Sequence, residues 1–436
     1  MKIEDLSVKE VVFMNVSISK VDCNNRSADR VSGFCPNCTK ARMASVKGSL
    51  VILLSCFCLV FTSCEKNKEV IGPSAGQYEV PIQTDDGWET TSLSSVGMDE
   101  APLLKLLQKL NGTADHRIHS ILIVKDGKLV FEEYFPGEKF KLAQPTGELG
   151  FDMYDTHTLC SVTKSVTSAL IGIAIDKGFI QSVDQKVFDF FPEYSDLLTS
   201  APEKNALTLE HLLTMTSGLQ WDDESTSYFD PRNDLYQLFR SQDPIRYILS
   251  KDLLMVPGTV FDYANCNTNV LGEIVRKASE DRLDDFAENY LFSKLGITDF
   301  EWQMLPNDVV FCSGDLMLRP RDMAKFGYLF LNDGIWKGEQ VISQEWIHIS
   351  TQKIIDPAAY SASYAWADGY GYQWWLWEDI YGVEYPAYLA AGWGGQWIIV
   401  SPNMNTVIVS TAGNYYTDVK IPIEEILIDY IIPSIS

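Results

Sequence analysis

The sequence predicts an α/β fold, with one antiparallel sheet flanked by an N-terminal and a C-terminal helix and with a mostly helical lobe at roughly residues 165–320. Three observations point to it. Strand-like runs lie early, at residues 118–134, and late, at residues 371–411; residues 159–300 read mostly as helices and loops; and apolar helical patterns open and close this part of the chain. The simplest fold joins the end strands into one sheet covered by the first and last helices. A cleft is expected between the sheet and the lobe.

The early elements follow from apolar spacing and from one turn. A helix is predicted over residues 101–110, with one face formed by Leu103, Leu104, Leu107 and Leu110. Strands are predicted at residues 118–124 and 128–134 because Asp126-Gly127 between them is a strong hairpin signal.

The late elements follow from the same criteria. Strands are predicted at residues 371–377, 396–401 and 406–411, with a turn at residues 402–405. An apolar helix is predicted at residues 423–432, and it closes the chain.

The N-terminal region predicts export. Residues 50–62, LVILLSCFCLVFT, form an uncharged run of 13, too short to span a bilayer and suited to the core of a signal peptide. With Ser63-Cys64 after it, the run resembles a lipoprotein signal. We expect an overcalled start at residues 1–42, a signal at 43–63, a lipidated Cys64, a tether at 64–90 and one domain at 91–436. The alternative interpretation is a buried strand or helix.

The net charge and the cysteines indicate which binding partners and which covalent cross-links to expect. The formal net charge is -24, and nucleic acid is excluded as a partner because phosphate binding needs a basic face. After processing, Cys64, Cys160, Cys266 and Cys312 would remain, too few and too widely spaced to indicate a disulfide framework. We expect a protein of the bacterial cell envelope whose contact with the membrane is the lipid anchor.

Ser161 and Lys164 form the S-x-x-K pair that context favours among four copies in the chain. Ser161 can cap a helix with a buried apolar series, and the three-residue spacing places Lys164 on the same face. A lysine can act as a base only when neutral, which requires desolvation worth about 4 kcal/mol. The alternative is an ordinary capping serine beside a solvated lysine.

The segment Tyr263-Ala264-Asn265 contains the only Y-x-N of the chain and favours the catalytic interpretation. A tyrosine beside the lysine offers a second proton carrier, able to relay hydrogen to a leaving group. Asn265 can hold Lys164 or the substrate carbonyl.

With SVTK at 161–164 and YAN at 263–265, the chain resembles the serine β-lactamase and penicillin-binding superfamily, especially its class C-like branch of esterases, D-amino-acid peptidases and aminohexanoate-oligomer hydrolases. Residues 207–219 and 319–336 are similar to recurrent structural segments of that branch. The resemblance spans roughly residues 122–412 and implies a β-lactamase-like fold. It further implies that Ser161 is acylated, that Lys164 is its base, that Tyr263 is general acid and base, and that Asn265 is a supporting contact.

The third motif departs from the superfamily pattern. Where β-lactamases carry K-T-G or H-T-G, this chain has Trp393-Gly394-Gly395 followed by Gln396, which resembles the W-G-G of some family esterases. A main-chain N–H of Gly395 or Gln396, paired with that of Ser161, would form the oxyanion hole. Trp393 in place of a cation removes one anchor for a substrate carboxylate, so neutral esters or amides are favoured over β-lactams and free-carboxylate peptides.

The expected protein is a lipid-anchored serine hydrolase that acts on a small ester, amide or peptide-like substrate without a metal or organic cofactor. Two alternatives stay open. One is a β-lactamase or D,D-peptidase. The other is a non-catalytic sensor that binds penicillin or peptidoglycan fragments.

Overall fold

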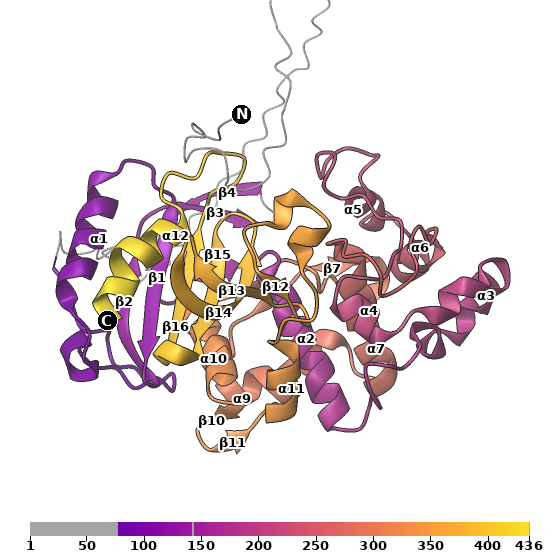
Figure 1. Cartoon of the computed structure of the whole chain (residues 1–436), viewed down its shortest axis with the longest axis horizontal. Helices are drawn as coiled ribbons and strands as arrows, with labels where there is room; N and C mark the ends of the chain where they lie inside the picture. The colour runs from indigo at the N-terminus through magenta and orange to yellow at the C-terminus, as the bar shows by residue number, and fades with distance from the viewer. Residues whose placement is uncertain (1–76, 142–143, 436) are drawn as a thin grey trace, which may run out of the picture. The chain divides into compact units, whose positions relative to one another are not determined.

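A seven-stranded antiparallel sheet forms the centre of the computed structural model, which describes residues 77–141 and 144–435. The strand order is β12-β13-β14-β15-β16-β1-β2, so strands from both ends of the domain lie side by side and the predicted α/β fold is confirmed (Figure 1). The strands are β1 (Ile118–Lys125), β2 (Lys128–Tyr134), β12 (Gly369–Tyr370), β13 (Trp375–Ile380), β14 (Val383–Gly392), β15 (Gln396–Ser401) and β16 (Thr406–Ala412).

The β1–β16 pair joins the two ends of the domain. The strands run antiparallel, with Ile121 opposite Ser410, and the hydroxyls of Ser120 and Thr411 lie 2.7 Å apart. Successive side chains of a strand point to opposite faces. Ile121 accordingly packs in the core on one side of the sheet, whereas Leu122 packs in the core on the other.

The first and last helices cover one face of the sheet, as predicted (Figure 1). Helix α1 (Glu100–Gly112) begins after Asp99, whose carboxylate accepts a hydrogen bond from the Ala101 N–H. It packs against the C-terminal segment, which the sequence predicts as one helix and which divides into α12 (Ile423–Ile426), a π-helical turn η10 (Leu427–Ile431) and α13 (Ile432–Ile435).

The other face packs on α10 (Pro320–Leu331) and leads into the helical region. Helix α2 (Val162–Asp176) is buried along nearly its whole length and contacts both β14 and α7 (Asn265–Ser279), so it connects the sheet to the helices. The remaining helices are α3 (Ser195–Ser200), α4 (Leu209–Leu213), α5 (Asp234–Leu238), α6 (Pro244–Ser250), α8 (Leu283–Ala287), η5 (Glu288–Phe292), α9 (Ser293–Leu295) and α11 (Gln344–Ser350).

Short elements connect these layers. The small strands are β3 (Glu138–Lys141), β4 (Gln144–Leu149), β5 (His157–Thr158), β6 (Glu301–Trp302), β7 (Met304–Leu305), β8 (Val309–Val310), β9 (Leu316–Leu318), β10 (Ile335–Trp336) and β11 (Glu339–Gln340). The 3₁₀ turns are η1 (Leu93–Val96), η2 (Val187–Phe190), η3 (Pro192–Tyr194), η4 (Pro202–Ala206), η6 (Pro306–Asp308), η7 (Pro357–Ala359), η8 (Ala362–Tyr364) and η9 (Pro402–Met404).

The domain begins earlier than residue 91. Trp88 is buried, and Arg321 of α10 donates hydrogen bonds to the carbonyl of Ile82 and to the carboxylate of Asp86. Residues 82–90, which the sequence places in the tether, therefore pack on the domain. The expected start, signal and lipidation site at residues 1–64 lie outside the described residues.

The strands differ from expectation at two places. Residues 371–374 were expected to be extended, but Gln373 has a φ of 65°, and its side-chain amide donates to the carbonyls of Leu212 and Leu213. The strand begins only at Trp375. Strand β14 was not predicted, because Glu384 and Pro386 interrupt its apolar pattern. Among the described residues, no helix combines the length and apolarity needed to cross a bilayer.

Candidate active site

Ser161 lies at the tight turn between β5 and α2. Cys160 just before it has a φ of 46°, a left-handed conformation that costs an ordinary residue about 1 kcal/mol or more. Ser161 occupies the N-cap position, yet its side chain makes no capping hydrogen bond. The predicted capping role is therefore not what holds the hydroxyl, and Ser161 as a residue is only partly buried.

Lys164 stands one turn further along α2 and is 1% exposed. Its Nζ donates to Ser161 Oγ at 2.9 Å, to Asn265 Oδ1 at 2.6 Å and to the carbonyl of Ser313 at 2.7 Å. Burial lowers the pKa of this amine to about 8, against the opposing effect of the Asp223 charge. A substantial fraction of Lys164 is therefore neutral near pH 8, as a base requires.

Tyr263 lies beside the Lys164 amine. The centroid of its ring is 5.0 Å from Lys164 Nζ, and its ring stacks on Trp375 with the ring centroids 5.5 Å apart. The Ser161 side chain is close enough to lower the pKa of its phenol in opposition to burial. Burial raises the pKa of the phenol, so the group keeps its proton at ordinary pH. It is consequently suited to donate a proton rather than to act as a phenolate.

Asn265 opens helix α7 and is held by a residue that the sequence analysis did not single out. Its Nδ2 donates to Asp223 Oδ2 at 2.6 Å, and Trp221 Nε1 donates to the same oxygen at 2.6 Å. Asp223 is 3% exposed. The carboxylate lies behind the amide that contacts Lys164, so the lysine and Asp223 are linked through one asparagine.

Ser313 was also missed by sequence reasoning. Its carbonyl accepts from Lys164, and its hydroxyl accepts from Asn269 Nδ2 at 3.0 Å. Asn269 lies one turn after Asn265 on α7 and also donates to the Asn265 carbonyl. Because the contact to the lysine comes from a main-chain oxygen, no side-chain pattern could have indicated it.

The W-G-G segment begins where β14 meets the nucleophile turn. A Cβ on Gly392 would stand 2.3 Å from the carbonyl oxygen of Leu159, two residues before Ser161, so the strand passes this turn without room for a side chain. Gly394 and Gly395 have φ values of 87° and 94°, which favour glycine. The turn therefore brings the predicted third motif beside the segment that carries the nucleophile.

Trp393 and Gln396 differ in what they contact. The Trp393 ring meets the rings of Tyr228, Tyr415 and Tyr416 at 5.5, 5.2 and 4.9 Å. The Gln396 side chain is buried and donates to the Ala412 carbonyl at 2.7 Å, so it ties β15 to β16 and leaves only the main chain for a substrate. The N–H of Gly395 donates to the Gly392 carbonyl and is engaged inside the turn.

The carboxyl groups of Asp223 and Glu224 both act on the Lys164 amine. Burial, followed by the charge of Asp223, raises the pKa of the half-buried Glu224 carboxyl to about 7.

Within residues 77–141 and 144–435, no three His, Cys, Asp or Glu side chains are grouped closely enough to hold a metal ion.

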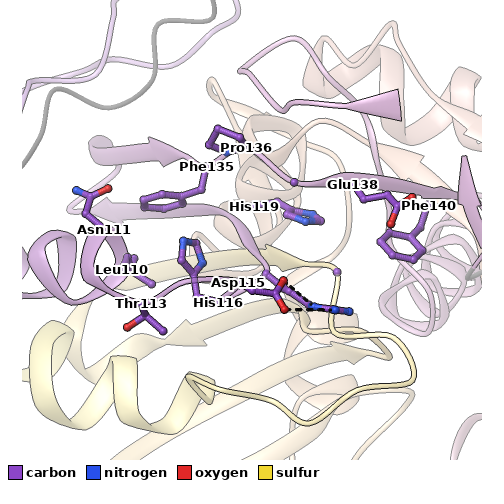
Figure 2. A pocket seen from close by; sticks show the side chains of 13 residues that line it. Leu110, Asn111, Thr113, Asp115, His116, His119, Phe135, Pro136, Glu138 and Phe140 are labelled. Carbon is purple, nitrogen blue, oxygen red and sulfur yellow. Dashed lines mark hydrogen bonds and ion pairs between the residues drawn. The ribbon is translucent and has the colours of Figure 1, made fainter. Parts of the chain in front are cut away.

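A separate cavity of about 360 Å³ lies at the end of α1 and the start of β1 (Figure 2). Figure 2 shows side chains from this segment facing those of residues 135–140. His119 lines the cavity and its Nδ1 lies 2.9 Å from His157 Nε2. None of the predicted catalytic residues lines this cavity.

Comparison with known proteins agrees with this geometry. A family model described as Beta-lactamase matches residues 105–419. The chain is 27% identical over 277 residues to 6-aminohexanoate-dimer hydrolase of Paenarthrobacter ureafaciens, and the match covers 60% of this chain and 67% of that protein. Protein flp of Staphylococcus aureus strain N315 is 25% identical over 191 residues, covering 43% of this chain but only 35% of that relative.

A solved structure shares the fold. The crystal structure of a family VIII carboxylesterase superposes with a TM-score of 0.58 at 16% identity, over 82% of this chain and 99% of that one. Since the family model covers well over half of the sequence and the fold agrees, the chain belongs to the β-lactamase family of serine hydrolases, with class C-like relatives.

Proposed function

We propose that the protein hydrolyses an ester or amide through an acyl-enzyme on Ser161. The observation that carries the proposal is the buried Lys164 amine 2.9 Å from the Ser161 hydroxyl. In its neutral form the amine takes the proton of Ser161 Oγ, and the oxygen attacks the substrate carbonyl carbon. Collapse of the tetrahedral adduct breaks the C–O or C–N bond and leaves the acyl group on Ser161.

The departing alcohol or amine needs a proton, which we assign to the Tyr263 phenol. The Tyr263 ring lies beside Lys164, and Ser161 is among the groups that influence its phenol, so the proton taken from Ser161 can return through Lys164 and Tyr263 to the leaving group. Water then attacks the acyl-enzyme, with the same groups acting in reverse. General acid and base groups of this kind contribute about 10² to 10⁴ in rate.

The developing oxyanion would be bound by the main-chain N–H groups of Ser161 and Gln396. Gly395 is the less suitable donor because its N–H already donates to Gly392. One such donor is worth about 3 to 4 kcal/mol of barrier.

The charges around the site favour a neutral substrate. Asp223 and Glu224 lie near Lys164, and Trp393 stands where the superfamily motif has a cation. A substrate carboxylate in this region would meet like charges in a partly desolvated environment, which is unfavourable. β-Lactam antibiotics and peptides with a free carboxylate are therefore the second choice.

A fluorophosphonate probe and a substrate panel test the proposal. The wild-type protein should be labelled and Ser161→Ala should not, and p-nitrophenyl esters should be turned over faster than nitrocefin or D-alanyl peptides. If nitrocefin is turned over faster, the protein is a β-lactamase. If D-alanyl peptides are turned over faster, it is a D,D-peptidase. Labelling without turnover of any substrate would support the non-catalytic sensor. Absence of labelling would refute the proposed acyl-enzyme on Ser161.

We also propose that the protein is exported and anchored through Cys64 in the bacterial cell envelope. The support is the uncharged run at residues 50–62 followed by Ser63-Cys64. Radiolabelled palmitate should be incorporated into the protein in cells and lost in Cys64→Ala. Equal incorporation in both proteins would refute the anchor.

A further inference from the structure

Asp223 takes part in the site through Asn265 without belonging to any recognised motif. Its Oδ2 accepts hydrogen bonds from Asn265 Nδ2 and from Trp221 Nε1, each at 2.6 Å. The main-chain carbonyl of Asp223 accepts a hydrogen bond from Asn233 Nδ2 at 3.1 Å. Asp223 is 3% exposed, so its carboxylate has little contact with solvent. Its position is thus fixed from three directions.

The carboxylate decides which way the Asn265 amide points. An amide can be turned end for end at almost no steric cost, so hydrogen bonding sets its orientation. Turned the other way, its NH₂ group would face the Lys164 amine, and its oxygen would face the Asp223 carboxylate. Both contacts would be repulsive, so Asp223 holds the oxygen of Asn265 toward Lys164.

The same carboxylate influences the charge of the lysine. Burial lowers the pKa of Lys164, and the negative charge of Asp223 is the largest influence in the opposite direction. The pKa of Asp223 itself is raised, because burial outweighs the N–H groups of Trp221 and Asn265 and the Lys164 amine, which lower it. The other titratable groups that act on the amine or lie beside it are Cys160, Glu224, Tyr263, Cys312 and Asp315.

We propose that Asp223 is a positioning residue that orients Asn265 toward Lys164, and that its negative charge sets the pH range in which Lys164 accepts the Ser161 proton. This inference rests on the acyl-enzyme function proposed above. It separates two effects of one side chain: the hydrogen bonds hold the geometry, and the charge keeps the lysine protonated to a higher pH.

Two substitutions separate these effects. Asp223→Asn keeps the volume and keeps one oxygen to accept from Trp221 and Asn265, but it removes the charge. Asp223→Ala removes both. Asp222→Asn is the matched control, since Asp222 is the exposed neighbour and undergoes the same chemical change.

The readouts are the rate of fluorophosphonate labelling of Ser161 and kcat/KM for p-nitrophenyl butyrate between pH 6 and 10. Loss of a negative neighbour disfavours the ammonium, so the pKa of Lys164 falls and the acid limb of both profiles moves to lower pH. In Asp223→Asn we expect a shift of at least about half a pH unit, with a plateau within about threefold of wild type. In Asp223→Ala we expect the plateau to fall at least about tenfold at every pH.

An acid limb in Asp223→Asn that coincides with those of wild type and Asp222→Asn would overturn the charge role. A wild-type plateau in Asp223→Ala would overturn the positioning role. Thermal unfolding checks the fold of each variant; if Asp223→Ala does not fold, Asn265→Asp decides the positioning role, because it places two carboxylates in contact and should lower the plateau. A wild-type protein that is not labelled at Ser161 would instead remove the function on which this inference rests.

Discussion

Gly392 lies so close to Leu159 that a Cβ on the glycine would be 2.3 Å from the leucine carbonyl oxygen. This approach joins the end of β14 to the turn that presents Ser161. Gly392→Ala should therefore push the two segments apart and lower kcat/KM by at least about tenfold, since a displacement of about 1 Å in an active site can cost 10²-fold. Gly112→Ala, at a glycine with no atom near its Cβ position, is the control and should keep wild-type activity.

Lys164→Ala should lower kcat for p-nitrophenyl esters by at least about a hundredfold, the lower end of general-base contributions. The reason is the loss of the only amine that contacts Ser161 within the described residues. Lys177→Ala, which removes an exposed amine just after the same helix, should leave kcat unchanged. A Lys164→Ala enzyme with near-wild-type turnover would refute the role of base.

Tyr263→Phe should preserve the ring packing on Trp375 and remove only the phenol. If the phenol protonates the leaving group, the loss of kcat should reach about a hundredfold for an alkyl ester and be smaller for a p-nitrophenyl ester, whose leaving group needs no proton. Comparison of the two substrates measures this. Equal losses for both would assign Tyr263 to another step, and Tyr416→Phe provides a control at an exposed tyrosine.

His119 and His157 should make the fold less stable in mild acid. His157 Nδ1 donates to the Thr158 carbonyl, so its Nε2 accepts from His119 Nδ1 and both rings are neutral. Burial lowers the pKa of His157 to about 4 and that of His119 to about 2, below the value near 6.5 in an unfolded chain. The unfolded state therefore binds more protons, and stability present above pH 6.5 is lost as pH falls toward 4.

The loss should amount to about 2 kcal/mol per histidine at pH 5, which urea unfolding at pH 5 and pH 8 measures. His119→Gln should reduce the difference between the two pH values. His348→Gln, at an exposed histidine, should not change it. An unchanged pH dependence in His119→Gln would contradict the assignment.

Arg321 should contribute strongly to stability. Its guanidinium is 3% exposed and contacts Glu132 and Asp86. Arg321→Met would leave a buried carboxylate without its cation, at a cost of about 3 to 5 kcal/mol. Arg232→Met, which breaks the exposed pair with Asp230, should leave the free energy of unfolding nearly unchanged. Equal free energies of unfolding for the two variants would show that the buried contacts are not stabilising.

Most of the sheet could be predicted because its strands carry local signals. Residues 396–401 form a strand with the predicted bounds, and Asp126-Gly127 forms the predicted hairpin. The strand prediction at residues 371–374 was wrong because Gln373, in a left-handed conformation, is held by hydrogen bonds to residues 212 and 213, which are far away in the sequence. Strand β14 was missed because neighbouring strands, and not its own composition, determine it.

The candidate site divides in the same way. Ser161, Lys164, Tyr263 and Asn265 were predicted from short motifs, and the structure brings them together. Asp223 was not predicted, because one carboxylate among 59 acidic residues has no distinguishing local pattern. Its role depends on a contact across 42 positions, which only the fold creates.

The pairing of β1 with β16 also bears on biosynthesis. Ser120 and Thr411 are partners 291 positions apart, so the β1–β2 hairpin leaves the ribosome long before the strand that will cover its inner edge. Until then that edge offers unpaired N–H and C=O groups to any other chain. The sheet can therefore close only after residues 406–412 have been synthesised, and until then the open edge of the hairpin is exposed to aggregation.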